Sequence, residues 1–213
     1  MPQSLIKFAS SLSLELSASQ VDKLVQYANR VWQKKDFLNL TSADSLQEVF
    51  NRHICDGLQG AACLAQLAHA KGLDSFSVTD AGAGAGYIGL VLAIASPNAR
   101  VTLVESIEKR CAFMNWVILN VGIKNAQVKN ARLGQHTLEQ TDFVTERAMG
   151  QLADILPLCL QITKVGGNFV AYQGQPPQLT QNMAQHTDGK MVQLLPYTLP
   201  TERRERYLAV FER

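Results

Sequence analysis

Strand-like and helix-like runs of apolar residues alternate through the middle of the chain. Residues 76–80 form a short apolar and β-branched run, 87–95 are apolar on nearly every side, and 101–104 are again strand-like. A strand, a helix and a strand in this order predict one βαβ unit of a parallel sheet. The alternation continues with strands predicted at 126–130, 143–146 and 168–172 and helices at 107–120 and 151–163.

The two ends of the chain have different patterns. Residues 1–70 carry helical repeats of apolar residues and no strand pattern, whereas 191–199 and 206–211 predict a terminal pair of antiparallel strands. We therefore predict a single α/β domain over 1–213, with a Rossmann-like core at 71–213. Its sheet has seven mostly parallel strands, and the helical N-terminal extension packs on that sheet.

The turn between the first strand and its helix carries the clearest chemical signal. It reads DAGAGAG from Asp80, so that Gly82, Gly84 and Gly86 stand at every second position. Glycines allow backbone angles closed to other residues and let a ligand approach the main chain. A dinucleotide site needs the spacing G-x-G-x-x-G instead. Asp80 would also repel a pyrophosphate, but it would attract the cationic amino-acid end of S-adenosylmethionine.

A second acid follows at the end of the next predicted strand. Glu105 lies where a carboxylate can accept hydrogen bonds from both hydroxyls of a ribose. Together with Asp80 and the glycines, Glu105 predicts a site for S-adenosylmethionine. The alternatives are a tight turn without a ligand and, for Glu105, a favourable charge beside the first turn of the next helix.

The charge of the chain limits how it could meet a nucleic acid. The formal net charge is +2, which is too small to indicate a nucleic-acid-binding protein by itself. Contacts with RNA would have to come from local clusters, such as Lys109 with Arg110 and Arg203 with Arg204 and Arg206.

Cysteine spacing favours a reducing compartment, and hydropathy gives no sign of a membrane segment. The four cysteines lie in apolar helical stretches without CxxC spacing or a histidine at ligand spacing, so we expect buried reduced thiols and no metal site. We expect a cytoplasmic protein without membrane contact, because no apolar run reaches spanning length and no signal peptide is evident. Trp32 and Trp116 fall on apolar helix faces and are predicted to be core residues.

Six segments of the chain resemble, in order, the bacterial small-subunit ribosomal RNA methyltransferase G family, also called glucose-inhibited division protein B. They are NLTS at 39–42, RHICD at 52–56, DAGAGAG at 80–86, LVESIEKR at 103–110, RA at 147–148 and RYLAVF at 206–211. The resemblance implies a class I methyltransferase fold behind a helical N-terminal cap. It also implies methyl transfer from S-adenosylmethionine to N7 of the guanine at position 527, in the 530 loop of 16S ribosomal RNA of the small subunit.

The resemblance also implies roles for single residues. By position, Gly82 and Tyr87 would line the cofactor loop, and Leu133 and Gly134 would lie against the adenine. Arg147 would close the site, both as its catalytic residue and as a contact of the cofactor. Arg147 follows the fourth strand, at the edge where open α/β sheets bind ligands. Contacts with RNA are implied for Arg52, His53, Lys109, Arg110, Arg132, Gln173 and Arg206.

Three positions depart from the family pattern. Ile88 stands where the family has a proline in the glycine loop, Gly134 where it has an acid near the adenine, and Gln173 where it has a lysine thought to meet RNA. Some of the implied RNA contacts have simpler explanations. Arg52 has the helical spacing of a surface ion pair with Asp56, and a helical histidine such as the one at 53 is more often a packing residue than a general base.

Several functions compete on the sequence alone. An NAD-dependent dehydrogenase is disfavoured by the glycine spacing and by the lack of a candidate proton relay. A methyltransferase for another RNA, a protein or a small molecule fits the modest charge, and Gln173 favours a noncatalytic, ribosome-associated module that binds S-adenosylmethionine. Because guanine N7 carries a free lone pair, the implied reaction needs alignment and neither a base nor a metal. We expect a monomer to perform it.

Overall fold

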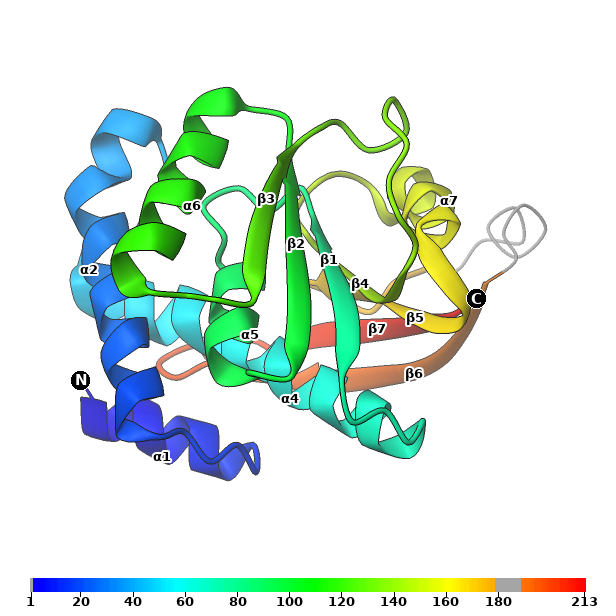
Figure 1. Ribbon diagram of the computed structural model, residues 1–213. Helices are drawn as coiled ribbons and strands as arrows, with labels where there is room; N and C mark the ends of the chain where they lie inside the picture. Colours follow the sequence, from blue (N-terminus) through cyan, green and yellow to red (C-terminus); the bar gives the residue numbers. More distant parts are fainter. Residues whose placement is uncertain (1, 179–188) are drawn as a thin grey trace.

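The structure, a computed structural model, describes residues 2–178 and 189–213. Within these ranges the strands form one seven-stranded sheet in the order β3-β2-β1-β4-β5-β7-β6 (Figure 1). The strands are β1 (Phe76–Ala81), β2 (Ala99–Glu105), β3 (Ala126–Asn130), β4 (Thr141–Arg147), β5 (Thr163–Gln173), β6 (Lys190–Tyr197) and β7 (Arg206–Glu212). Strands β1 to β5 are parallel, and β7 runs antiparallel to β5 and β6. The predicted sheet of seven mostly parallel strands is confirmed.

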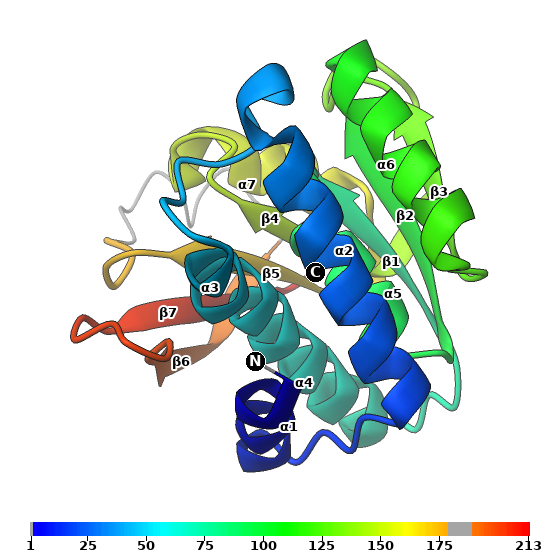
Figure 2. The ribbon, with the colours of Figure 1, turned by 90° about the vertical axis from the view of Figure 1, so that its left-hand side faces the viewer.

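The helices before β1 form the predicted N-terminal extension. They are α1 (Pro2–Ser11), α2 (Ala18–Leu38), α3 (Leu46–Glu48), the π-helical turn η1 (Val49–Ile54) and α4 (Cys55–Ala70). Between the strands, α5 (Gly89–Ala95), α6 (Glu108–Val121) and α7 (Leu152–Gln161) follow β1, β2 and β4. Helices α2, α4, α5 and α6 lie on one side of the sheet, with α1 packed against α2 and α4, whereas α7 packs on the opposite face (Figure 2).

Helix α2 is fixed at both ends by its own sequence. The Ser17 hydroxyl accepts a hydrogen bond from the Gln20 N–H (3.3 Å), and Gln20 Oε1 accepts one from the Ser17 N–H (2.9 Å), which together make a capping box. Leu24 and Tyr27, three residues apart, are fully buried against the core. The helix ends at Leu38, and the capping residue Asn39 that follows has a left-handed φ of 49°.

The two faces of the sheet are covered unequally. Beneath α7 lies a packed apolar cluster that includes Val144, Phe169 and Phe211. The connection from β3 to β4, residues 131–140, contains no helix. This arrangement leaves space at the carboxyl edge between β2 and α7, the position at which open α/β sheets bind ligands.

Side-chain burial tests three of the sequence predictions. All four cysteines are buried and free, as predicted. Trp32 is partly buried against the core. The prediction for Trp116 is wrong: it is 39% exposed, with the Arg30 guanidinium 5.6 Å from its ring centre. Phe113 and Val117 fill the buried side of α6, so that Trp116 lies at the margin of that face. Within the described ranges, no helix is long and apolar enough to cross a membrane.

Candidate active site

The turn after β1 depends on its glycines for two different reasons. Gly82, Gly84 and Gly86 have φ values of 64°, 60° and 88°, which side chains rarely tolerate. A Cβ at Gly86 would lie 2.6 Å from the side chain of Leu90, so this glycine serves helix packing. At Gly84 the nearest atom to such a Cβ is 3.9 Å away. The main chain is therefore open to a ligand at Gly84.

Asp80 caps the helix that follows this turn. Its Oδ2 accepts a hydrogen bond from the Gly89 N–H (2.8 Å), and its Oδ1 accepts one from the Thr145 hydroxyl (3.1 Å). Helix α5 consequently begins at Gly89, two residues later than the sequence pattern predicted. Burial raises the pKa of Asp80 to about 6, although both hydrogen bonds oppose the shift. The carboxyl group occupies the helix terminus that a pyrophosphate would need.

Glu105 ties the end of β2 to the glycine turn. Its Oε2 accepts from the Gly84 N–H and its Oε1 from the Ile107 N–H, each at 2.9 Å. Arg110 Nη1 lies 3.8 Å from Oε2, and the Glu105 side chain is only 6% exposed. The carboxylate is thus held in one orientation before any ligand binds.

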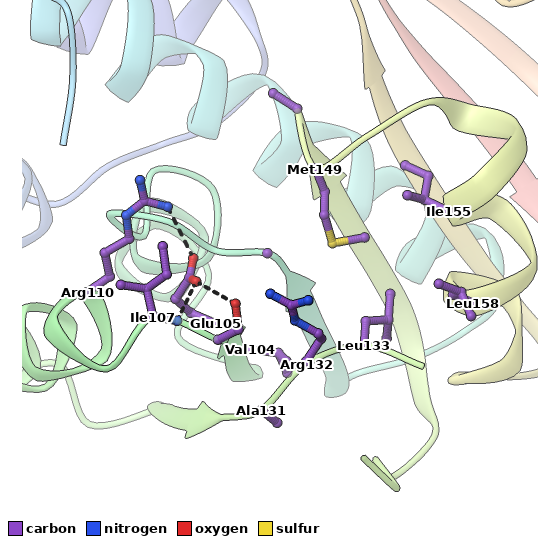
Figure 3. A pocket seen from close by; sticks show the side chains of 13 residues that line it. Val104, Glu105, Ile107, Arg110, Ala131, Arg132, Leu133, Met149, Ile155 and Leu158 are labelled. Carbon is purple, nitrogen blue, oxygen red and sulfur yellow. Dashed lines mark hydrogen bonds and ion pairs between the residues drawn. The ribbon is translucent and has the colours of Figure 1, made fainter. Parts of the chain in front are cut away.

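A cavity of about 500 Å³ opens beside this carboxylate (Figure 3). Figure 3 shows Glu105 and Arg110 on one side of it and Met149, Ile155 and Leu158 on the other. The remaining lining residues are Gly82, Val104, Ser106, Ile107, Ala131, Arg132, Leu133 and Ala148. This volume lies within the range of about 300–1,000 Å³ found for small-molecule sites.

A second cavity, of about 180 Å³, adjoins the first at the glycine turn. It is lined by Leu40, Asp80, Gly82, Ala83, Gly84, Ala85, Tyr87, Ile88, Arg110, Arg147 and Ala148. Gly82, Arg110 and Ala148 belong to both cavities. The pair can therefore hold one elongated ligand with chemically different ends.

Arg147 borders the smaller cavity and is held by a buried acid. Its Nη1 lies 2.8 Å from Asp56 Oδ2, and its guanidinium is 5.1 Å from the centre of the Tyr87 ring. Asp56 is fully buried in the first turn of α4 and also accepts a hydrogen bond from the Tyr197 hydroxyl (2.5 Å). Burial opposes the charge on Arg147, but Asp56 more than offsets it and raises the arginine pKa above its ordinary value.

His53 packs beside this arginine as a neutral ring. It stacks on Tyr87 with ring centres 4.0 Å apart and planes at 12°. Burial, with the nearby charges of Arg147 and Arg52, lowers the pKa of His53 to about 3. Its Nε2 is 2.7 Å from the Thr41 hydroxyl, and its Nδ1 is 3.5 Å from Arg147 Nη2. Since an arginine only donates, Nδ1 is the acceptor and the ring proton lies on Nε2.

The remaining implied RNA residues fall into two groups. Lys109 and Arg132 are exposed, and Gln173 is half-buried at the end of β5. Arg206 is only 13% exposed and donates two hydrogen bonds of 2.8 Å to Glu202. The structure thus places Arg206 inside an ion-pair network.

Arg52 does not form the ion pair that its spacing from Asp56 indicated. Its partners are Glu48 at 3.3 Å and Glu202 at 3.9 Å. The π-helical turn η1 widens the backbone between positions 52 and 56, so a spacing of four no longer keeps them on one face. Asp56 is left to pair with arginines from β4 and β7.

The cavities also include residues that the sequence did not single out. Met149, Ile155 and Leu158 follow β4 at the ligand-binding edge, a position that a close reading of the βα connection could have indicated. Leu133 lines the larger cavity as implied, whereas Gly134 faces Leu158, whose Cδ2 would be 3.1 Å from a Cβ there. Among the described residues, no three His, Cys, Asp or Glu side chains are grouped as metal ligands would be.

Comparison with solved structures shows which known fold this chain has. Magnesium protoporphyrin IX methyltransferase from Synechocystis PCC 6803, with bound S-adenosylmethionine, has a TM-score of 0.58 at 13% identity and covers 86% of this chain and 97% of its own. A putative RNA methyltransferase from Pyrococcus horikoshii has a TM-score of 0.54 at 17% identity, over 73% of this chain and 82% of its own. The chain therefore has the Rossmann-like fold of class I S-adenosylmethionine-dependent methyltransferases.

Sequence comparison then identifies the family. A family model for rRNA small subunit methyltransferase G matches residues 20–206. The protein named ribosomal RNA small subunit methyltransferase G is 32% identical in Herminiimonas arsenicoxydans, over 98% of this chain and 94% of its own length. Its namesake in Limosilactobacillus reuteri is 31% identical over 94% and 86%. The chain belongs to the rRNA small subunit methyltransferase G family, as the resemblance predicted.

Proposed function

We propose that this protein transfers a methyl group from S-adenosylmethionine to N7 of the guanine at position 527, in the 530 loop of 16S ribosomal RNA. The acceptor is the small ribosomal subunit or its precursor, and the protein acts as a monomer in the cytoplasm. The observation that carries the proposal is the meeting of two cavities at the glycine turn, one beside Glu105 and one beside Arg147. Family membership supports the substrate, because the curated relatives are named for the small ribosomal subunit.

The larger cavity fits the nucleoside end of S-adenosylmethionine. Each Glu105 oxygen accepts one backbone N–H, and Oε1 also accepts a long hydrogen bond from the Ser106 hydroxyl (3.5 Å), which a ribose hydroxyl can replace. Ile107, Leu133 and Leu158 offer apolar surface to the adenine. The open main chain at Gly84 leads toward the smaller cavity, where the amino-acid end would lie. When bound, S-adenosylmethionine supplies a methyl group activated by its sulfonium.

The acceptor base would meet the Arg147 side of the smaller cavity, while the amino-acid end of S-adenosylmethionine would lie at its glycine turn. The Asp56 carboxylate holds the Arg147 guanidinium, which lies over the buried ring of Tyr87. An arginine in this position can donate to guanine O6, which lies beside N7. Arg147 is thus proposed to orient the base. Asp80 is proposed to hold the glycine turn in the shape that receives the cofactor, by capping the helix after that turn.

The chemistry of N7 suits a site without a general base. Guanine N7 has a free lone pair and no proton to remove. His53, with its pKa near 3, stays neutral and is a very weak base. Both Asp80 oxygens already accept hydrogen bonds. The protein's contribution is therefore to align the reacting atoms and exclude water.

Contact with RNA is proposed for the more exposed of the implied residues. Arg132 lines the larger cavity and is exposed, and Lys109 is exposed next to Arg110, so that both can meet phosphates. Arg52 and Gln173 are partly exposed and keep the same role. For Arg110 and Arg206, which neighbour Glu105 and Glu202, we propose mainly internal roles: Arg110 supports the cofactor carboxylate and Arg206 the loop before β7.

Transfer of a labelled methyl group to isolated ribosomal subunits tests the proposal. Small subunits that lack the modification should accept label, whereas large subunits should not. Arg147→Ala should lower the single-turnover rate about 100-fold through lost alignment, with little change in binding of S-adenosylhomocysteine. Label that appears only on protein or small molecules would contradict the proposed acceptor. Binding of S-adenosylmethionine without transfer to any acceptor would support a noncatalytic module.

A further inference from the structure

Helix α2 ends with an exposed phenyl ring next to the active site. Phe37, in the last turn of the helix, is 83% exposed. Asn39 and Leu40 both donate their N–H groups to Lys35 O, which fixes the end of the helix. Leu40 then lines the smaller cavity, and its carbonyl oxygen accepts a hydrogen bond from the Tyr87 hydroxyl (3.3 Å). Phe37 therefore lies three residues before Leu40, a lining residue of the smaller cavity, in a segment that hydrogen bonds hold in place.

The turn of α2 that carries Phe37 lies at the carboxyl edge of the sheet, close to the smaller cavity. Three residues of chain span at most about 11 Å, so the backbone of Phe37 is close to Leu40 and the cavity. Helices α2 and α6 run side by side in opposite directions (Figure 2), and Lys23 near the start of α2 bonds to Gly122 O after the end of α6 (2.9 Å). The last turn of α2 consequently neighbours the first turn of α6, which carries exposed Lys109.

The surroundings of the ring are mildly cationic. Lys34 and Lys109 are exposed on the two neighbouring turns. Lys35 Nζ lies 2.8 Å from Asp36 Oδ1, so the negative charge of Asp36 is neutralised by its neighbour. Glu108 also lies in the first turn of α6, which leaves a small positive surplus. An aromatic ring between lysines suits a polyanion with unpaired bases.

Exposure alone does not distinguish Phe37. Leu119 and Val165 are 81% and 84% exposed, and single apolar residues on a surface need no explanation. Both lie near the amino ends of the parallel strands, away from the cavities, because Leu119 is in the last turn of α6 and Val165 is near the start of β5. Phe37 combines an aromatic ring, basic neighbours and a place at the acceptor cavity.

We propose that Phe37 is a stacking platform for a nucleobase adjacent to the methyl acceptor, with Lys34 and Lys109 meeting the flanking phosphates. This inference rests on the proposed function as an RNA methyltransferase. Unpaired bases of RNA loops are commonly recognised by stacking on aromatic side chains. A guanine displayed in a loop has unpaired neighbours that can make this contact.

Equilibrium binding to an unmodified RNA hairpin that carries the 530 loop tests the inference. Phe37→Ala should weaken binding about 5- to 150-fold, since base stacking on an aromatic side chain is worth about 1–3 kcal/mol. Phe37→Trp should bind at least as tightly as the wild type. Leu119→Ala is the matched control and should bind like the wild type. Unchanged melting temperature and unchanged affinity for S-adenosylhomocysteine would separate lost stacking from misfolding.

Measuring binding apart from methyl transfer distinguishes two kinds of failure. If the wild type methylates small subunits and Phe37→Ala binds the hairpin equally well, stacking is refuted and the proposed function stands. If Phe37→Ala alone loses hairpin affinity but no guanine is methylated by the wild type, stacking stands and the proposed reaction fails. An equal loss in Leu119→Ala, or no binding of the hairpin by the wild type, refutes the stacking platform.

Discussion

Replacing Asp56 by asparagine should lower both the stability of the protein and its rate of methyl transfer. Asp56 Oδ2 lies 2.8 Å from Arg147 Nη1, and the side chains are 0% and 21% exposed. At an effective dielectric constant of about 20, two unit charges at this separation attract by about 6 kcal/mol. Desolvation and solvent access to Arg147 oppose that attraction, so we expect a net coupling of about 2–3 kcal/mol.

A double-mutant cycle measures this coupling. Asp56→Asn keeps an acceptor for the Tyr197 hydroxyl, and Arg147→Met keeps an apolar stem. In denaturant unfolding, the double variant should lose about 2–3 kcal/mol less free energy of unfolding than the two single variants lose together. The exposed pair of Lys71 and Glu212, 3.3 Å apart, is the control and should couple by less than about 1 kcal/mol.

The rate of methyl transfer separates a positioning role from a purely structural one. In Asp56→Asn the single-turnover rate at saturating substrates should fall about tenfold or more, because the guanidinium of Arg147 is no longer held. The affinity for S-adenosylhomocysteine should stay close to that of the wild type. The claim that Asp56 positions Arg147 would be refuted if the losses of unfolding free energy in the cycle were additive. It would also be refuted if folded Asp56→Asn transferred methyl groups at the wild-type rate.

Three further predictions concern single residues. Glu105→Ala should weaken S-adenosylhomocysteine about 10- to 100-fold in calorimetry, a loss of about 1.5–3 kcal/mol; an unchanged affinity would remove Glu105 from the site. The pKa of His53 is about 3 when folded and about 6.5 when unfolded, so only the unfolded chain takes up this proton between those values. The stability of the wild type relative to His53→Asn should therefore fall by about 1.4 kcal/mol per pH unit below about pH 6, and a difference independent of pH would contradict the assignment. Gln173→Lys should tighten RNA binding, and the slope of the log of the binding constant against the log of the salt concentration should become steeper by about 0.7–0.9. If neither the affinity nor the slope changes, position 173 does not face RNA.

Most of the fold could be predicted because its signals are local. Strand β1, the glycine turn and Glu105 lie within one continuous βαβ stretch, and the period of the apolar residues indicates each element directly. The start of α5 was misplaced because Asp80, a residue of the preceding strand, caps the helix at Gly89. An apolar run shows no such cap.

The acceptor side of the site could not be predicted because its contacts are distant in sequence. Asp56 meets Arg147 and Tyr197, which lie 91 and 141 residues further along the chain. Local spacing pointed to Arg52 as the partner, and the π-helical turn breaks that spacing. Arg206 looked like part of a basic surface cluster, but Glu202, four residues before it, holds its guanidinium. Charge patterns in a sequence do not reveal which charges neutralise one another.

Mapping the methylated nucleotide tests the central claim most directly. Small subunits that lack the modification are incubated with the protein and S-adenosylmethionine, and their RNA is then treated with borohydride and aniline, which break the chain at N7-methylguanine. We predict a single new break at the guanine of position 527 that requires both protein and cofactor and is lost with Arg147→Ala. Methyl label without a chain break, or a break at another guanine, would contradict the assignment.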